Sequence, residues 1–236
     1  MKKILAILLA VATVFALAGC AGDSDKKGEG VMTYAQYEAA ELNSEVTIET
    51  YVQAKQSWWD NKVTVYTQDK EGGYFLYNMA CSEADNEKLK PGTKIRVKGY
   101  KSEWSGEVEI TDATFEVLPG NYVAKAEDVT SLYGTDNLIK KQNIFAAFKG
   151  FTIEAYDESG AAFAYKNTEE KSDDLYFKAS INGQTYDFCI EFYLTGKDTE
   201  VYKAVENLKV GDKVDMEGFL YWYNGADPHI TSLKVK

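Results

Sequence analysis

The stretch LKPGTKIRVKGY, residues 89–100, returns 119 residues later as LKVGDKVDMEGF, residues 208–219. Both blocks read Leu-Lys-x-Gly-x-Lys, then aliphatic residues at alternate positions, then a glycine followed by an aromatic residue. This pattern predicts a tight turn that leads into a half-buried strand and ends in a glycine bend. The alignment continues past the blocks, where Trp104 matches Tyr223 and Gly106 matches Gly225. The sequence therefore indicates two copies of one structural unit.

The residues around each block supply the other strands of a small β unit. Apolar and polar residues alternate there, and Asn182-Gly183 is a strong signal for a tight hairpin. In the first unit we expect strands at 46–52, 63–66 and 74–77, a short helix at 82–89 begun by Ser82, and strands at 94–100 and 107–117. In the second unit we expect strands at 147–156, 175–180 and 185–194, a helix at 199–208, and strands at 213–220 and 230–235.

The N-terminus reads as an export signal. Residues 1–19 have a basic start, an apolar run and a small-residue end, and the run is shorter than the roughly 20 residues of a membrane span. The sequence Leu17-Ala-Gly-Cys20 resembles the bacterial lipobox. This resemblance implies cleavage before Cys20, a lipid on its thiol, and an extracytoplasmic location anchored to a bacterial cell membrane. Residues 21–30 carry no large apolar side chain, so we expect a flexible tether.

Five strands with one helix between the third and the fourth is the order of the OB-fold. With its two repeated blocks and the GEVEITDA stretch at 106–113, the chain resembles bacterial lipoproteins with tandem OB-like domains. We therefore expect an all-β fold with short helices: two tandem five-stranded Greek-key barrels after a lipoprotein signal peptide. The expected parts are the signal peptide (1–19), lipidated cysteine and tether (20–30), first barrel (31–118), linker or helical lead-in (119–146) and second barrel (147–236). The resemblance adds a fold and no catalytic residue.

The charge of the chain bears on its partners. The formal net charge is −11, and removal of the two signal lysines makes it −13. Arg96 is the only arginine, although clustered arginine and lysine are what phosphate backbones need. We therefore expect nucleic acid to be a disfavoured partner and the membrane, through the lipid, to be a partner. The sequence leaves the oligomeric state open.

No residue pattern indicates catalysis, a metal site or a cofactor. His229 is the only histidine, and we expect it to be a strand residue near a barrel rim. Cys81 and Cys189 are either two buried thiols or a bridge between the units. Two groups of carboxylates are expected to be solvated loop charge, with weak Ca²⁺ binding as the alternative: Glu103, Glu107 and Glu109 in one, and Glu169, Glu170, Asp173 and Asp174 in the other.

The aromatic residues are the best functional lead in the sequence. Some of them fall in the loop between strands one and two, or in the loop between strands four and five, which flank the usual ligand groove of an OB-fold. Their flat rings can stack on a ligand, or they can instead cover barrel ends and pack the two barrels together. The candidate ligand-binding residues are Trp58, Trp59, Trp104, Tyr221, Trp222 and Tyr223.

These observations favour a non-catalytic binding module that contacts a glycan or a protein through its aromatic loops. An envelope accessory or assembly protein, with the aromatic residues buried between the barrels, is the alternative. An exported nucleic-acid-binding or hydrolase-associated protein is the third hypothesis, and strong salt-dependent binding to single strands would support it.

Overall fold

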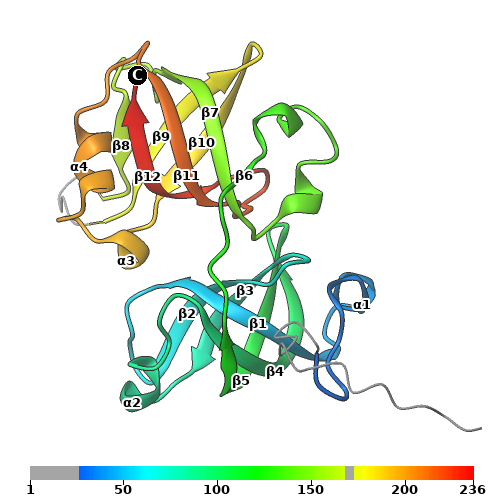
Figure 1. The fold of residues 1–236 in the computed structure, drawn as a ribbon. Coiled ribbons are helices and arrows are strands. Elements are labelled where there is room, and N and C mark those ends of the chain that lie inside the picture. The colour runs from blue at the N-terminus through cyan, green and yellow to red at the C-terminus, as the bar shows by residue number, and fades with distance from the viewer. Residues whose placement is uncertain (1–26, 168–172) are drawn as a thin grey trace, which may run out of the picture.

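The structure is a computed structural model that describes residues 27–167 and 173–236. Two β-barrels follow one another along the chain, and a single extended segment connects them (Figure 1). The proposed signal peptide, Cys20, and the carboxylates Glu169 and Glu170 lie outside the described residues. Within these residues, no helix has the length and apolar character needed to cross a membrane.

The first barrel is closed by five strands. These are β1 (Glu45–Lys55), β2 (Lys62–Gln68), β3 (Gly73–Ala80), β4 (Thr93–Trp104) and β5 (Glu107–Asn121). Their order around the barrel is β1-β2-β3-β5-β4, and β4 pairs again with β1. The strands β3 and β5 run parallel, while the other neighbours are antiparallel. The helix α2 (Glu83–Asn86) lies between β3 and β4, and Ser82 caps it by accepting a hydrogen bond from the Asp85 amide.

The second barrel repeats this topology. Its ring consists of β7 (Phe145–Glu154), β9 (Leu175–Ile181), β10 (Gln184–Ile190), β11 (Lys213–Phe219) and β12 (His229–Val235). The β7–β9 pairing closes the ring, and β10 runs parallel to β12. Two short strands, β6 (Glu127–Asp128) and β8 (Phe163–Tyr165), attach to its edges, while α3 (Phe192–Thr195) and α4 (Glu200–Glu206) connect β10 to β11. The predicted fold of two tandem five-stranded OB-like barrels is therefore confirmed.

The repeated glycines occupy equivalent places in the two barrels. Gly92 and Gly211, in the turns before β4 and β11, have φ values of 91° and 92°, which only glycine adopts at little cost. Gly99 and Gly218 lie where the partner strand passes very close. A Cβ atom on Gly218 would stand 2.2 Å from the carbonyl oxygen of His229, so a side chain cannot fit there without moving β12.

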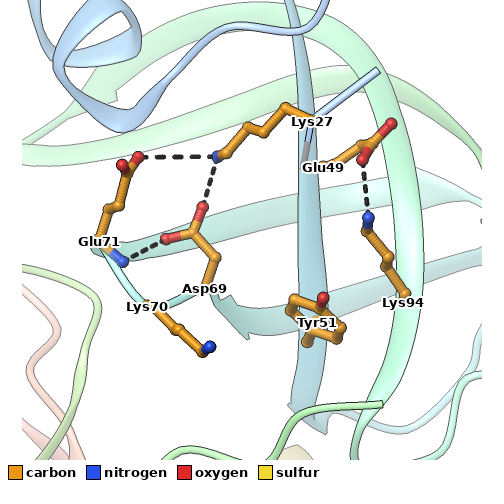
Figure 2. A pocket seen from close by; sticks show the side chains of 7 residues that line it. All are labelled: Lys27, Glu49, Tyr51, Asp69, Lys70, Glu71 and Lys94. Atoms are coloured by element: carbon orange, nitrogen blue, oxygen red, sulfur yellow. Dashed lines mark hydrogen bonds and ion pairs between the residues drawn. The ribbon is translucent and has the colours of Figure 1, made fainter. Parts of the chain in front are cut away.

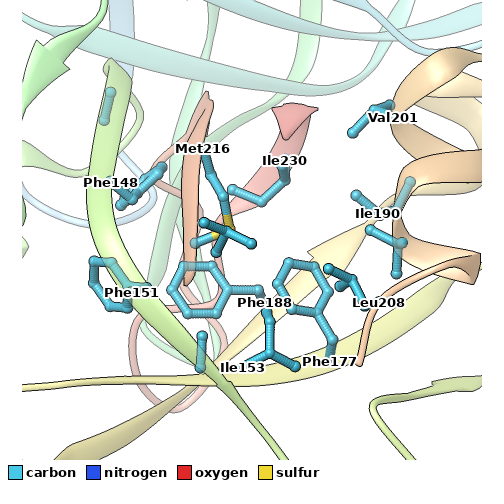
Figure 3. Close-up of a cluster of buried hydrophobic side chains, with 14 of the residues drawn as sticks. Phe148, Phe151, Ile153, Phe177, Phe188, Ile190, Val201, Leu208, Met216 and Ile230 are labelled. Carbon is cyan, nitrogen blue, oxygen red and sulfur yellow. The ribbon is translucent and has the colours of Figure 1, made fainter. Parts of the chain in front are cut away.

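Each barrel has its own apolar core, and a tyrosine from the preceding segment packs against it. Phe188 lies at the centre of the second core, where its ring contacts those of Phe148, Phe151 and Phe177 (Figure 3). In the first barrel this residue is Tyr37, which belongs to the capped helix α1 (Tyr34–Ala39). In the second it is Tyr133, directly after the 3₁₀ turn η1 (Thr130–Leu132). A second 3₁₀ turn, η2 (Ile139–Lys141), precedes β7.

One predicted strand ends earlier than expected. We expected it to cover 185–194, but β10 ends at Ile190. The reason is local, because the Glu191 carboxylate accepts a hydrogen bond of 2.6 Å from the Leu194 amide and thereby starts the helix α3. A carboxylate from the end of a strand is consequently turned toward the junction of the two barrels.

The two barrels are packed together by aromatic residues that belong to neither barrel core. Tyr66 and Phe75, from the outer face of β2 and β3, contact Phe219 and Tyr221 of the second barrel. Hydrogen bonds between the barrels include the Phe145 amide to the Gln68 side chain at 2.7 Å. The β2–β3 face is the one that OB-folds commonly use for ligands, so in the first barrel part of it is covered by the second.

Candidate ligand-binding site between the barrels

A cavity of about 580 Å³ lies at the junction of the two barrels. Its floor is the outer face of β9 and β10, where Tyr176 and Cys189 point outward while Phe177 and Phe188 point into the core. The loop that connects β11 to β12 forms one wall, and the first barrel forms another. The position corresponds to the usual ligand face of an OB-fold, so the second barrel keeps this face partly open.

The cavity wall next to β9 contains an ion pair between Lys166 and Asp174, and both groups already have partners within the protein. Lys166 Nζ lies 2.9 Å from Asp174 Oδ2, and the Tyr176 hydroxyl donates to the same oxygen at 3.3 Å. The other oxygen of Asp174 accepts a hydrogen bond of 2.9 Å from the Phe192 amide. This aspartate therefore holds the start of α3 and the cavity wall in place.

Two further carboxyl groups line the cavity without an ion-pair partner among the described residues. Glu191 is one, and burial together with the nearby Asp174 raises its pKa to about 7. Asp227 is the other, and burial with the nearby Asp187 and Asp174 raises its pKa to about 7. In the part of the chain that the structure describes, the buried Oδ1 atom of Asp227 has no hydrogen-bond donor. Such a group is costly in a folded protein unless something else binds it.

His229 faces the same cavity but is held uncharged. Its Nδ1 atom lies 2.6 Å from the Tyr66 hydroxyl, which itself accepts a hydrogen bond from Gln56. The tyrosine proton is thus directed to Nδ1, and the proton of the neutral ring is placed on Nε2. Burial lowers the pKa of His229 to about 3, and its ring stacks on Tyr221 at 4.2 Å. His229 is the first residue of β12, and it lies buried between the barrels.

The structure separates the six candidate aromatic residues. Trp104, Tyr221 and Tyr223 line the cavity together. Trp222 packs against the second core, and the Trp58 indole donates to the Cys81 carbonyl oxygen at 2.8 Å. Trp59 is 81 % exposed at a turn and does not line the cavity.

The expectation of solvated loop charge is wrong for several carboxylates. Glu107 is fully buried, because the loop of the second barrel covers it and the Trp222 amide donates to Oε2 at 2.9 Å. Burial holds the pKa of Glu107 well above its usual range. Glu109 and Asp174 are buried too. Sequence reasoning could not find them, because the residues that cover them are distant in the chain.

Cys81 in the first barrel and Cys189 in the second are both buried free thiols. Burial also raises the pKa of the Cys189 thiol, so it lines the cavity as a small neutral group. No cluster of three or more His, Cys, Asp or Glu side chains suited to a metal ion occurs within 27–167 and 173–236.

A smaller cavity on the first barrel differs in character. It has a volume of about 70 Å³ and is lined mostly by charged side chains (Figure 2). These charges satisfy one another, since Lys27 pairs with Asp69 at 2.6 Å and Lys94 pairs with Glu49 at 2.9 Å. The cavity between the barrels, with its unpaired carboxyl groups, is therefore the better candidate site.

Comparison with known proteins returned structures and no sequence family. No family model matches the chain, and no curated protein matches it. A murine DNA-binding protein bound to double-stranded DNA is 11% identical, with a TM-score of 0.34 over 80% of this chain and 97% of that one. The p204 HINb domain is 10% identical, with a TM-score of 0.36 over 84% and 100%. A replication protein A heterotrimer bound to single-stranded DNA is 13% identical, with a TM-score of 0.31 over 83% and 49%.

These structures contradict two of our expectations. We expected a glycan or protein ligand and regarded nucleic acid as a disfavoured partner, but two of these three structures are described as bound to DNA, one double-stranded and one single-stranded. Both expectations are therefore corrected. At this level of identity the likeness concerns the fold, so the ligand class has to come from the geometry of the site.

Proposed function

We propose that the protein binds a small organic ligand in the cavity between its barrels and does not transform it. The observation that carries this proposal is the carboxyl group of Asp227, whose Oδ1 atom is buried without a donor from the described residues, in a cavity walled by aromatic rings. The volume of about 580 Å³ is that of a small-molecule site. Because the aromatic interface fixes the barrels against each other, the cavity exists before a ligand arrives, which lowers the cost of binding.

Replacing Trp104 by alanine is expected to weaken ligand binding about tenfold, because a ring that covers one side of the ligand is lost. Trp104 is 62 % exposed, so we expect the free energy of unfolding to change by less than about 0.5 kcal/mol. The measurement is a thermal-unfolding screen of cationic, neutral and anionic small molecules, followed by titration of those that raise the melting temperature.

The matched control is Trp59→Ala, which removes an exposed tryptophan that does not line the cavity. It should bind every ligand as the unchanged protein does. The proposal fails if no compound raises the melting temperature, or if the compounds that do so bind Trp104→Ala and the unchanged protein equally well.

Single-stranded nucleic acid is the second candidate, and the exposed rings at the mouth of the cavity favour it. Tyr77, Trp104 and Tyr223 are all exposed there, and successive bases stack on such rings in other proteins. Fluorescence anisotropy with a labelled oligonucleotide at several salt concentrations tests this. Binding that Trp104→Ala and Tyr223→Ala both weaken would favour nucleic acid, and its absence would leave the small ligand as the only candidate.

We also propose that the protein is exported and carries a lipid on Cys20, on the basis of the signal-like residues 1–19 and the lipobox-like Leu17-Ala-Gly-Cys20. Expressed in a bacterium, the full chain should enter the detergent phase and show the mass of a lipidated Cys20. A Cys20→Ser variant should enter the aqueous phase. Equal partitioning of the two proteins would contradict lipidation.

A further inference from the structure

The walls of the cavity between the barrels carry more negative than positive groups. Three carboxyl groups face it, from Asp174, Glu191 and Asp227, and one ammonium group faces it, from Lys166. The ammonium group of Lys166 already forms an ion pair with Asp174, with 2.9 Å between Nζ and Oδ2. Two carboxyl groups therefore remain for a ligand, and among the described residues neither has a lysine or arginine within ion-pair distance.

The carboxyl groups of Glu191 and Asp227 differ in the hydrogen bonds that they accept from the protein. Glu191 accepts backbone hydrogen bonds at the start of α3, from the amides of Leu194, at 2.6 Å, and Tyr193. Within residues 27–167 and 173–236, Asp227 has no donor at its buried Oδ1, although its backbone amide donates to the Tyr221 carbonyl oxygen at 3.0 Å. The loop is thus held in a conformation that keeps an acceptor unsatisfied, and a ligand that donates hydrogen bonds would satisfy it.

The remaining lining favours a cation rather than a neutral donor. Tyrosine and tryptophan rings attract positive charge to their faces, and five of them line this cavity: Tyr77, Trp104, Tyr176, Tyr221 and Tyr223. The one histidine of the chain could have supplied a competing charge, but burial lowers its pKa to about 3 and keeps it neutral.

We propose that the cavity takes a small organic cation, with its ammonium group against Asp227 and its hydrocarbon part against the tyrosine rings. This inference rests on the proposed ligand-binding function and specifies the chemical class of its ligand. The ligand supplies the donor that Asp227 lacks and the positive charge that the two carboxyl groups lack.

Binding of a cation is coupled to the loss of a proton. The pKa values of Asp227 and Glu191 are both raised to about 7, so each carboxyl group is largely protonated at pH 6. A cation favours the ionised form, so affinity rises with pH through 7 and levels off above it. A single carboxyl group with this pKa accounts for about a tenfold gain between pH 6 and pH 8. The titratable groups that influence the two carboxyls are Tyr66, Tyr133, Tyr156, Lys166, Asp174, Tyr176, Asp187, Cys189 and Tyr221.

The experiment compares charged ligands with uncharged ligands of the same shape. Benzylamine, choline and spermidine are titrated calorimetrically into the protein at pH 6 and pH 8, in two buffers of different ionisation enthalpy. Benzyl alcohol is the neutral match for benzylamine. We expect at least one amine to bind at least tenfold more tightly than benzyl alcohol. Its affinity should rise about tenfold from pH 6 to pH 8, with protons released to the buffer.

The variant Asp227→Asn is expected to lose at least tenfold in amine affinity, together with the part of the pH dependence that the Asp227 carboxyl group contributes. Its control is Asp60→Asn, which removes an exposed carboxylate outside the cavity, at a left-handed residue that asparagine accepts. This control should bind amines as the unchanged protein does.

The possible failures are distinguishable. If benzyl alcohol binds as tightly as benzylamine, or if no amine binds while another compound binds in a Trp104-dependent way, the cation inference is overturned and the binding function stands. If no compound of any class binds in a Trp104-dependent way, both are overturned.

Discussion

Replacing Gly218 by alanine is expected to lower the free energy of unfolding of the second barrel by about 3 kcal/mol. The added Cβ would lie 2.2 Å from the His229 carbonyl oxygen and 2.7 Å from the Ile230 Cα atom. Both are backbone atoms of the paired strand β12, so no side-chain rotation relieves the clash. The pairing of β11 with β12 already shifts register at Glu217 and Gly218, which places His229 opposite Phe219.

The same substitution is expected to disturb the cavity. His229 begins β12, and its ring contacts Tyr66 and Tyr221. A displaced His229 breaks the 2.6 Å contact between the barrels, so ligand binding should weaken together with stability. Urea denaturation gives the change in free energy, and ligand titration gives the change in affinity.

The control for Gly218 is Gly211→Ala, in the equivalent block. No atom of the described part of the chain lies within 4 Å of a Cβ at Gly211, so its φ of +92° is what opposes a side chain there, at a cost of about 1 kcal/mol. If the two alanine variants lose equal stability, the close approach of β12 is not the reason that residue 218 is glycine.

Much of the fold was predictable because it rests on local patterns. The repeated blocks contain the turn glycines and the alternation of β4 and β11, and the Asn182-Gly183 turn places both residues at positive φ, as a tight hairpin needs. The missed features depend on tertiary contacts. The strand β10 ends at Ile190 because the next side chain, Glu191, caps a helix, and the three-residue strand β8 exists only by pairing with β9.

The candidate site was predictable only in part. The positions of Trp104, Tyr221 and Tyr223 in the strand-four to strand-five loops were visible from the repeat, and the structure brings these three into one cavity. Asp227 was not visible as a site residue, since an acidic residue in a loop is normally solvated. Its burial depends on residues that are distant in the chain, and two of them, Asp174 and Asp187, lie near its carboxyl group.

Replacing Asp227 by asparagine is expected to stabilise the protein at pH 8 by about 3 kcal/mol more than at pH 5. The pKa of Asp227 is raised from 3.8 to about 7, mainly by burial. A carboxyl group with a raised pKa stabilises the folded state below the pKa of the unfolded chain, and this contribution is lost as the pH rises through 7. Asparagine does not ionise, so the variant avoids that loss and keeps the same loop, whose Asp227 contact to Tyr221 is made by the backbone.

Urea denaturation at pH 5 and pH 8 checks this expectation, with Asp60→Asn as the matched substitution at an exposed position outside the cavity. An Asp227→Asn variant whose stability relative to the unchanged protein is the same at both pH values would show that the carboxyl group is not held at a raised pKa. A residue whose replacement stabilises the fold and also abolishes ligand binding is one kept for function, because folding alone would favour its loss. Asp227 is expected to meet both conditions, since its buried charge costs stability and is also the group that a cationic ligand would neutralise.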